Sequence, residues 1–402
     1  MMRLNRLLEA ILPENNFYAD KLAGVSWPLR SLEELAAWPL TTKHELVQHS
    51  PDGSRAANGT FEVDAYARFH QTSGTSGRPM VVLDTAEDWR WWVQGWQYVL
   101  DAAEITAADR TLLAFSFGPF IGFWSAHDAL VERGALVVPG GGMTTSARLQ
   151  LLATSRATAL FCTPTYALRM VEVARDENID LRKQRVRNVV VAGEPGGSLP
   201  AVRGAIEEAF DASVIDHSGA TEVGPWGFGD ASGAGLYVNE AEFVAELLRP
   251  GTSDRATEGE LAELVLTGLG RAGAPILRYR TGDLVRARRP EAGERKFLFL
   301  EGGVLGRADD MMVIRGVNIF PSAIEQILRE FPGVVEFRLT AARDGAMDQL
   351  YIEVEDAAND PQRIADQLNR RLGLRVDVHV APPGSLPRYE GKSRRFVDNR
   401  GR

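Results

Sequence analysis

The sequence predicts an α/β protein with a large N-terminal domain and a small α+β domain at its C-terminus. Between about residues 110 and 300, short apolar runs such as "ALVVP" and "ATALFC" alternate with helical stretches such as "PTYALRMVEVARDE". This alternation is typical of βαβ units around a parallel sheet that is buried on both faces. After about residue 305, the strand-like runs "EFRLTAA", "QLYIEVE" and "RVDVHVA" are interleaved with helical stretches. We therefore expect two domains, over residues 1–305 and 306–402.

Two helices are expected in the C-terminal domain, because both stretches carry end signals. The first, over residues 322–331, begins with Ser322 and Glu325 in the spacing of a capping box. The second lies within "PQRIADQLNRRLG", with Pro361 at its first position and Gly373 just past its end.

Composition and charge exclude several classes of protein. The 402 residues are 45% hydrophobic and 25% charged, an ordinary globular composition. The net charge of −9 argues against a nucleic-acid-binding surface, which needs clustered Lys and Arg. The single cysteine, Cys162, excludes an internal disulfide and a multi-cysteine zinc site, and a reducing cytoplasm fits. The longest nearly apolar run, residues 112–124, is shorter than the ~18 residues of a membrane span, and we expect no export signal.

The loop "HQTSGTSGRPM", residues 70–80, concentrates glycines and hydroxyl side chains. Glycines allow successive backbone N–H groups to point into one concavity, which suits a polyphosphate, whereas a solvated turn is the alternative. Two other nucleotide motifs are excluded. The only Gly-Lys-Ser, residues 391–393, has Leu386 where a Walker A loop needs its first glycine. "GLGRAG" (268–273) is followed by no helical pattern, so we interpret it as an ordinary loop.

Five further segments follow this loop in order. They are "VAGEPGGS" (191–198), "HSGATEVG" (217–224), "YRTGDLV" (279–285), "GRADDMMVIRGVNIFPSAIE" (306–325) and "PRYEGKSRRF" (387–396). Together with the loop they resemble the ordered motifs of the acyl-adenylate-forming (AMP-binding) superfamily, and "AGEP" and "RGVNIFPSAIE" are most similar to its phenylacetate-CoA ligase-like group. The resemblance covers nearly the whole chain. It implies a large multi-sheet adenylate-forming domain, a small mobile C-terminal domain and an AMP-forming acid–thiol ligase.

The resemblance implies that ATP and Mg²⁺ bind to the large domain. Glu222 would hold Mg²⁺ and act in catalysis, Asp283 would accept hydrogen bonds from both ribose hydroxyls, and Arg307 would contact the ribose and phosphate side. A solvated loop carboxylate is the alternative for Glu222, and a surface ion pair is the alternative for the other two. The expected ATP-binding residues are Thr72, Ser73, Gly74, Thr75, Ser76, Gly77, Gly193, Glu194, Pro195, His217, Ser218, Gly219, Ala220, Thr221, Asp283 and Arg307.

One position departs from the family pattern. Ser218 stands where "YGxTE" carries an aromatic residue, so the ring expected to stack on adenine is missing. Two interpretations of the neighbouring His217 stay open: it replaces the missing ring, or it is a core histidine.

The resemblance makes Lys392, in "LPRYEGK", the residue on which adenylation depends. An ammonium group can bridge the attacking carboxylate and the α-phosphate as charge develops. A basic tail that binds polyanions is the alternative interpretation of this segment. Because Lys392 and the phosphate loop lie on different domains, we expect the domains to close on each other. Asp309, in the glycine-containing stretch 302–310, matches the hinge position.

The acid is expected to bind beside the aromatic stretch "FSFGPFIGFW" (115–124) and near "TPTY" (163–166). Aromatic faces suit a flat aryl acid, although most aromatic clusters belong to a core. The candidate acid-binding residues are Phe115, Phe120, Trp124, Thr163 and Tyr166.

The expected function is activation of a small aromatic carboxylic acid and transfer of its acyl group to coenzyme A. Loading of a carrier-protein phosphopantetheine, with an acyl carrier protein as partner, is one alternative, and a non-catalytic adenylate-binding protein is another. No nucleic-acid or membrane partner is expected. The sequence does not fix the oligomeric state and leaves a homodimer open.

Overall fold

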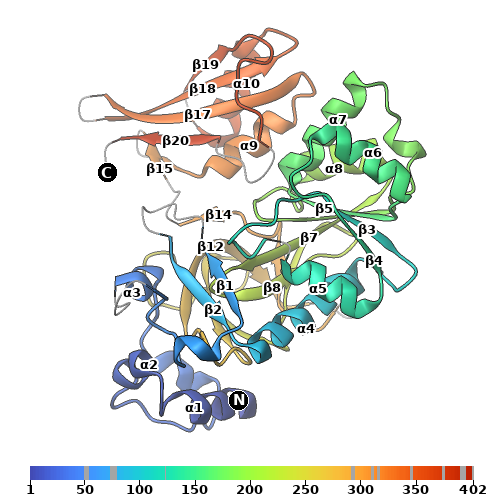
Figure 1. Ribbon diagram of the computed structural model, residues 1–402. Helices are drawn as coiled ribbons and strands as arrows, with labels where there is room; N and C mark the ends of the chain where they lie inside the picture. Colours follow the sequence, from blue (N-terminus) through green and yellow to red (C-terminus); the bar gives the residue numbers. More distant parts are fainter. Residues whose placement is uncertain are drawn as a thin grey trace.

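The computed structural model describes residues 1–48, 54–72, 79–122, 124–290, 295–308, 312–314, 317–344, 347–373, 376–389 and 395–400. A large N-terminal part carries a smaller C-terminal part on one side (Figure 1). Some predicted site residues lie outside the described residues. They are Ser73, Gly74, Thr75, Ser76, Gly77, Asp309 and Lys392.

The large part is built on a sheet that is parallel at one end and antiparallel at the other. Its strands are β3 Arg110–Leu113, β4 Leu136–Pro139, β5 Ala159–Cys162, β6 Asn188–Ala192, β7 Ser213–Ala220, β8 Gly224–Phe228, β9 Gly235–Val238, β10 Phe243–Leu248, β11 Leu261–Gly268, β12 Tyr279–Arg288, β13 Phe299–Glu301 and β14 Gly306–Arg307. They follow the order β10-β11-β12-β13-β9-β8-β7-β6-β5-β3-β4, with β14 paired to β12. Antiparallel pairing begins between β7 and β8.

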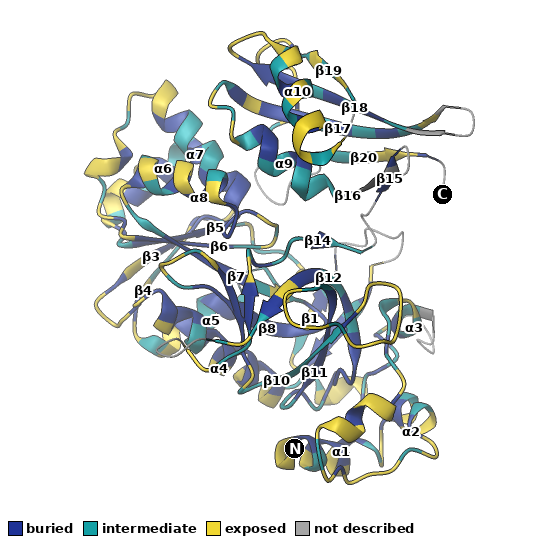
Figure 2. Cartoon of the chain, turned by 180° about the vertical axis from the view of Figure 1, so that it is seen from behind, coloured by how far each residue is buried: buried dark blue, intermediate teal, exposed yellow. Residues whose placement is uncertain are grey.

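Helices cover both faces of the parallel end (Figure 2). They are α4 Ala86–Ala102, α5 Trp124–Arg133, α6 Thr145–Ser155, α7 Pro164–Asp176 and α8 Pro200–Phe210. Alternate residues of a strand point to opposite faces. Phe161 and Val190 therefore pack with α4 and α5, whereas Leu160 and Val189 pack with α6, α7 and α8. Fully burying one such side chain contributes roughly 1.5–3 kcal/mol, so the apolar runs that predict the sheet also hold the helices on it.

Shorter elements precede and link these layers. They are α1 Met2–Ile11, α2 Asn16–Lys21, η1 Glu33–Ala37, α3 Lys43–Gln48, η2 Val63–Ala65, β1 Arg68–Gln71, β2 Val81–Asp84 and η3 Leu181–Lys183. The strands β1 and β2 form an antiparallel hairpin, which is a second sheet of the large part. The hairpin therefore brackets the predicted phosphate loop.

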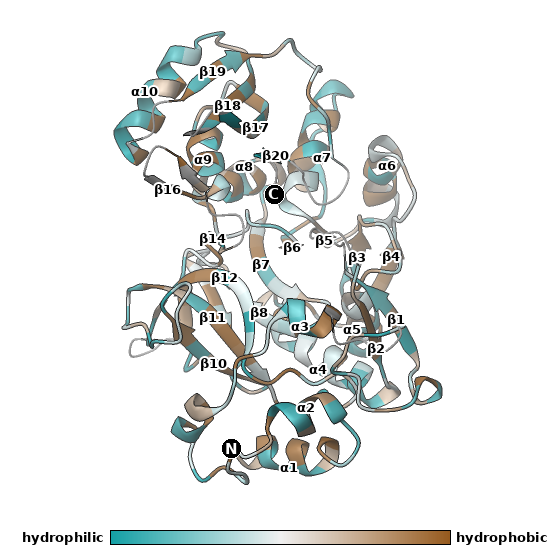
Figure 3. Cartoon of the chain, turned by 90° about the vertical axis from the view of Figure 1, so that its left-hand side faces the viewer, coloured by the Kyte–Doolittle hydropathy of each residue, from teal (hydrophilic) through white to brown (hydrophobic). Residues whose placement is uncertain are grey.

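The C-terminal part is a small α+β unit. Its elements are β15 Met312–Ile314, β16 Val317–Ile319, α9 Pro321–Arg329, β17 Val334–Asp344, β18 Met347–Asp356, α10 Pro361–Leu372, β19 Asp377–Val380 and β20 Phe396–Asn399. The main sheet has the order β19-β18-β17-β20, and both helices contribute to its core. In Figure 3, α10 is largely hydrophilic, and its buried residues are Ile364 and Leu368.

The predicted end signals are confirmed for one of the two C-terminal helices and wrong for the other. The α10 prediction is confirmed: Asp360 accepts a hydrogen bond from the Arg363 N–H, Pro361 is the first helical residue, and Gly373 has φ 65°. The capping-box prediction for α9 is wrong. The helix already begins at Pro321, so Ser322 lies inside it, and its hydroxyl donates to the Leu305 carbonyl instead.

The predicted fold class is confirmed by these layers: an α/β large part with more than one sheet, and a small α+β C-terminal part. The domain boundary at residues 305 and 306 stays a prediction. Across the residues that the structure describes, no helix combines the length and the apolar character needed to cross a bilayer.

Candidate active site

Three predicted site segments meet at the carboxyl ends of neighbouring parallel strands. Thr163 follows β5, Gly193 follows β6, and Ser218 lies near the end of β7. Cys162 pairs with Val191 in the register, and the strands β6 and β7 are aligned in the same way. A Cβ atom on Gly193 would lie 3.7 Å from Thr163 Cγ2. Because ligands of open α/β sheets bind at this edge, the predicted acid-binding and adenine-binding segments lie next to each other where a ligand is expected.

The loop after β6 is fixed by contacts with β7 and α7. Ser198 donates a hydrogen bond of 2.6 Å to the buried carboxyl group of Asp216, and burial raises the pKa of Asp216 to about 6. A side chain at Gly197 would collide with Asp216, since its Cβ would lie 2.5 Å from the carboxyl carbon. Glu194 accepts a 2.9 Å hydrogen bond from the backbone N–H of Thr165 in α7. The backbone of residues 193–198 is therefore held against β7 and α7.

His217 has the contacts expected of a core histidine. Its ring is buried and lies 4.2 Å from the Trp96 ring, centroid to centroid. Burial lowers the pKa of His217 to about 4, so the ring is neutral near pH 7. Its Nδ1 lies 2.8 Å from the Gly227 carbonyl oxygen and donates to it in the neutral form. The neighbouring Ser218 is half-buried and Gly219 is exposed. A role of His217 beside adenine stays a prediction.

The pKa of His217 gives a testable pH dependence. Between pH 6.5 and pH 4 the unfolded chain binds a proton at this histidine that the folded chain does not, so the free energy of unfolding falls as the pH falls. His217→Asn keeps an N–H donor for Gly227 and removes the titration. We expect the wild type to lose about 2 kcal/mol more than this variant between pH 7 and pH 5.

Urea unfolding followed by tryptophan fluorescence at several pH values measures this difference. His44→Asn, at an exposed position of α3, is the matched control and should keep the wild-type slope. Equal slopes in the wild type and His217→Asn would contradict a neutral buried ring.

The base of the phosphate loop is closed by backbone and side-chain hydrogen bonds. The Thr72 N–H donates to the Met80 carbonyl at 2.9 Å, and the Met80 N–H donates to the Thr72 hydroxyl oxygen at 3.0 Å. The Gln71 N–H donates to the Pro119 carbonyl at 2.5 Å. The loop therefore starts beside the aromatic stretch that is predicted to bind the acid.

The buried Glu222 carboxylate contacts two side chains, and neither contact is predicted from the sequence. Lys43 Nζ lies 3.2 Å from its Oε1, and the Tyr279 hydroxyl donates to the same oxygen at 3.0 Å. Burial alone would raise the pKa of Glu222, but the charge of Lys43 and the hydrogen bonds from the Glu222 backbone N–H, Tyr279 and Lys43 outweigh it, and the pKa is lowered. The group is therefore an ionised carboxylate.

An ionised carboxylate at this position fits Mg²⁺. Mg²⁺ in nucleotide sites is usually held by one or two carboxylates, phosphate oxygens and water. Among the described residues, no cluster of three or more His, Cys, Asp or Glu could hold a metal ion by itself. Glu222 would therefore hold Mg²⁺ together with the phosphates of a nucleotide.

The loop 268–273 has a structural role that is not evident from its glycine pattern. It forms no helix, which confirms that it is not a dinucleotide-binding turn. Its Arg271 is 1% exposed and donates to the buried Asp84 carboxylate at 2.7 Å and to the Thr221 carbonyl at 3.0 Å. This arginine joins the end of β2 to the residue before Glu222. Sequence reasoning missed it, because the partners are far apart in the chain.

Asp283 and Arg307 are neighbours on β12 and β14. They are paired in the register, and Arg307 Nη1 donates to Asp283 Oδ1 at 3.1 Å and to the Thr281 carbonyl at 3.1 Å. The arginine side chain is 39% exposed and the aspartate 17%. The two side chains form an ion pair with each other, and their role beside the ribose stays a prediction.

The predicted acid-binding residues divide into two groups. Phe115 and Phe120 pack edge to face with centroids 5.6 Å apart, and Trp124 donates from Nε1 to the Gly118 carbonyl at 3.0 Å. Phe120 is 36% exposed. Thr163 is buried and caps α7, whereas Tyr166 is fully buried and donates to Thr145 at 3.1 Å within the α6–α7 core. Phe120 is thus accessible, and Tyr166 is enclosed.

Comparison with known proteins identifies the family. Residues 26–245 match the AMP-binding enzyme family, and residues 316–400 match the AMP-binding enzyme C-terminal domain. Phenylacetate-coenzyme A ligase of Aromatoleum evansii is 31% identical over 389 residues, which cover 92% of this chain and 86% of the relative. The enzyme of the same name from Thermus thermophilus is 30% identical over 429 residues, which cover 99% of this chain and 95% of the relative.

A solved relative matches in structure as well. A 2-hydroxyisobutyryl-CoA ligase in its postadenylation state, in complex with R3-HIB-AMP, superposes with a TM-score of 0.92 at 28% identity, covering 99% of this chain and 88% of the relative. The fold and the strand-end segments define an adenylate-forming enzyme, an AMP-forming acid–thiol ligase. The chain belongs to the AMP-binding enzyme family and to its phenylacetate-CoA ligase-like group.

The same comparison describes the arrangement of the two parts. In its thioesterification state, the 2-hydroxyisobutyryl-CoA ligase superposes with a TM-score of 0.74 over the same share of this chain, against 0.92 in the postadenylation state. The whole chain of this protein therefore superposes better on the postadenylation state than on the thioesterification state.

Proposed function

We propose that this enzyme activates an aromatic carboxylic acid and transfers its acyl group to coenzyme A. In the first step a carboxylate oxygen of the acid attacks the α-phosphorus of ATP, and pyrophosphate leaves. In the second step the thiol of coenzyme A attacks the acyl carbon, AMP leaves and the thiol proton is released. The observation that carries the proposal is the meeting of Thr163, Gly193 and Ser218 at one edge of the parallel sheet.

The proposed roles follow from the charges that the first step brings together. An anionic acid approaches a polyanion, so positive charge must be supplied where the repulsion develops. Lys392 supplies it at the α-phosphate, and Mg²⁺ beside Glu222 would neutralise phosphate oxygens. Asp283 and Arg307 hold the ribose. Asp309 is the proposed hinge between domains 1–305 and 306–402.

Two kinds of relative differ in the class of acid that their names give, so acids of both classes have to be tested as substrates. The phenylacetate-CoA ligases share about 30% identity with this chain, which supports an aryl acid. The exposed Phe120 and its neighbour Phe115 support it too, because aromatic faces suit flat rings. The 2-hydroxyisobutyryl-CoA ligase, however, has the same fold.

Acyl-CoA formation should therefore be measured with phenylacetate, benzoate, anthranilate and 2-hydroxyisobutyrate. We expect the highest kcat/KM with one of the aryl acids. A higher value with 2-hydroxyisobutyrate would contradict the proposed substrate class and leave the reaction type standing.

The acceptor needs a separate comparison. Equal amounts of coenzyme A and of a holo carrier protein are offered with the best acid, and thioester is measured by mass spectrometry. We expect turnover with coenzyme A. Efficient loading of the carrier protein without formation of acyl-CoA would show that the carrier protein, and not coenzyme A, is the acceptor. Absence of any thioester product with every acid would favour a non-catalytic adenylate-binding protein.

A further inference from the structure

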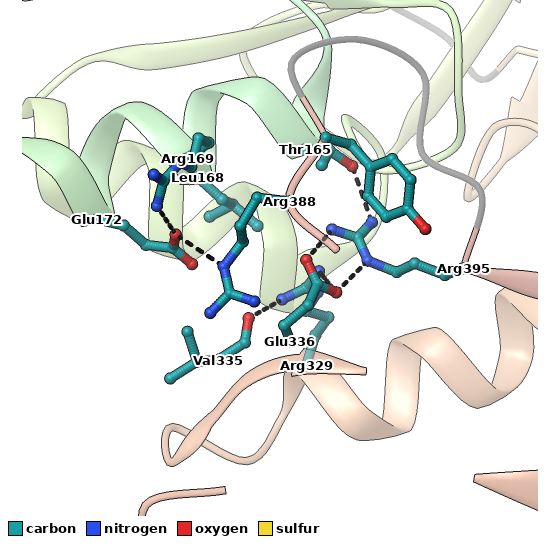
Figure 4. Close-up of a pocket in the computed structure, with 10 residues that line it drawn as sticks. Thr165, Leu168, Arg169, Glu172, Arg329, Val335, Glu336, Arg388 and Arg395 are labelled. Carbon is teal, nitrogen blue, oxygen red and sulfur yellow. Dashed lines mark hydrogen bonds and ion pairs between the residues drawn. The ribbon is translucent and has the colours of Figure 1, made fainter. Parts of the chain in front are cut away.

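Arg395 is a buried cation at the interface between the two parts of the protein (Figure 4). Its Nε and Nη2 donate to the two oxygens of Glu336 at 2.5 and 3.0 Å. The rings of Phe337 and Tyr389 lie 5.2 and 5.8 Å from its guanidinium carbon. All these partners belong to the C-terminal part. The guanidinium group is therefore oriented by its own domain.

The remaining nitrogen reaches the large part. Arg395 Nη1 donates to the Thr165 hydroxyl oxygen at 2.9 Å and lies 3.4 Å from Glu325 Oε1. Thr165 is the second residue of α7 and is 7% exposed. Its backbone N–H donates to Glu194, in the segment predicted to line adenine. One chain of contacts thus runs from Glu336 through Arg395 and Thr165 to Glu194.

A second arginine contact to α7 is weaker. Arg388 Nε lies 3.6 Å from Glu172 Oε2, and both side chains are about one quarter exposed. An exposed ion pair of this kind contributes roughly 0–1 kcal/mol. A hydrogen bond from a charged donor between two side chains that are 7% exposed or less is stronger. The Arg395–Thr165 contact therefore dominates this side of the interface.

We propose that Arg395 is a positioning residue for adenylate formation, because its hydrogen bond to Thr165 holds the C-terminal domain over the active site. The inference rests on the proposed function. Arg395 is three residues after the proposed catalytic Lys392 in the sequence, so a contact at Arg395 acts on the same stretch of the chain. The arrangement matches the postadenylation state of the solved relative better than its thioesterification state, so the contact serves the first step and opens for the second.

The test separates the two half-reactions. Thr165→Val removes the acceptor hydroxyl and keeps the backbone N–H for Glu194, whereas Thr165→Ser keeps both. We expect Thr165→Val to slow acid-dependent pyrophosphate exchange about 10-fold. Thr165→Ser should stay close to wild type. Thioester formation from supplied acyl adenylate should be unchanged in both variants.

A double-mutant cycle shows whether the hydroxyl acts through the arginine. Thr165→Val should slow pyrophosphate exchange when it is introduced into the wild type. It should cause no further slowing when it is introduced into the Arg395→Ala variant. Arg371→Gln, which removes an exposed ion pair with Glu330 in the same domain, is the matched control and should behave as wild type. If Arg395→Ala does not fold, the comparison of Thr165→Val with Thr165→Ser still decides.

Two results would overturn the inference: unchanged exchange in Thr165→Val, or equal loss in both half-reactions. These outcomes are distinct from failure of the proposed function, in which the wild type itself forms no acyl adenylate with any acid.

Discussion

Replacing Lys392 by alanine is expected to slow acyl-adenylate formation about 100- to 1,000-fold, the cost typical of removing one charge-stabilising group at a reacting centre. The reason is that the ammonium group would stabilise the charge that develops between the carboxylate and the α-phosphate. This stabilisation is present in the transition state but not in the ground state. Thioester formation from supplied acyl adenylate should largely survive. Single-turnover measurements of the two half-reactions check this separation.

Lys183→Ala is the matched control for Lys392→Ala. Lys183 is a lysine of η3 with an 82% exposed side chain and an ion pair with Asp180, so its loss should change neither half-reaction. Lys392 lies outside the described residues, and its role depends on the family motif. Equal loss of both half-reactions in Lys392→Ala would contradict a role confined to adenylation.

Glu222→Gln is expected to have the second largest effect. Glutamine keeps the shape of the side chain and an acceptor for the Tyr279 hydroxyl, but it removes the negative charge that faces Lys43. If this carboxylate holds Mg²⁺ with the nucleotide, pyrophosphate exchange should fall about 100-fold at low Mg²⁺ and recover partly at high Mg²⁺. A titration of the exchange rate against Mg²⁺ measures the shift.

Lys43→Met distinguishes the two functions that Glu222 could have. If Glu222 mainly neutralises Lys43, losing either partner should have a similar effect on the exchange rate. If Glu222 binds Mg²⁺, Lys43→Met should shift the dependence toward lower Mg²⁺ concentrations, because it removes a cation that lies 3.2 Å from the same carboxylate oxygen. An unaltered dependence in Glu222→Gln would contradict the metal role.

The sequence predicts the parallel part of the fold well, because its signal is local. The run "ATALFC" and the residues around Val190 are apolar on both faces, and each becomes a strand covered by helices on both sides. The ends of α10 follow from Pro361 and Gly373 for the same reason. The start of α9 is mispredicted because the capping-box spacing is preferred over Pro321, which marks the first helical residue as Pro361 does in α10. The partner of the Ser322 hydroxyl could not be predicted locally, because it lies 17 residues away.

The candidate site is predicted only where a motif carries it. The order of the segments identifies Gly193, Ser218 and Glu222. The motifs do not show how these residues are supported: Arg271 contacts Asp84 across 187 positions of the chain, and Arg395, although it lies within the segment 387–396, contacts Thr165 across 230. Such contacts depend on how distant segments are folded together, which a single sequence does not display.

The central claim is that acid and ATP form an acyl adenylate before coenzyme A takes part. Incubating the enzyme with ATP, Mg²⁺ and an accepted acid, without coenzyme A, and analysing the quenched mixture by mass spectrometry tests it directly. The account predicts acyl-AMP and pyrophosphate in this mixture, and acyl-CoA and AMP once coenzyme A is added. The appearance of ADP and inorganic phosphate, or of no product until coenzyme A is present, would contradict it.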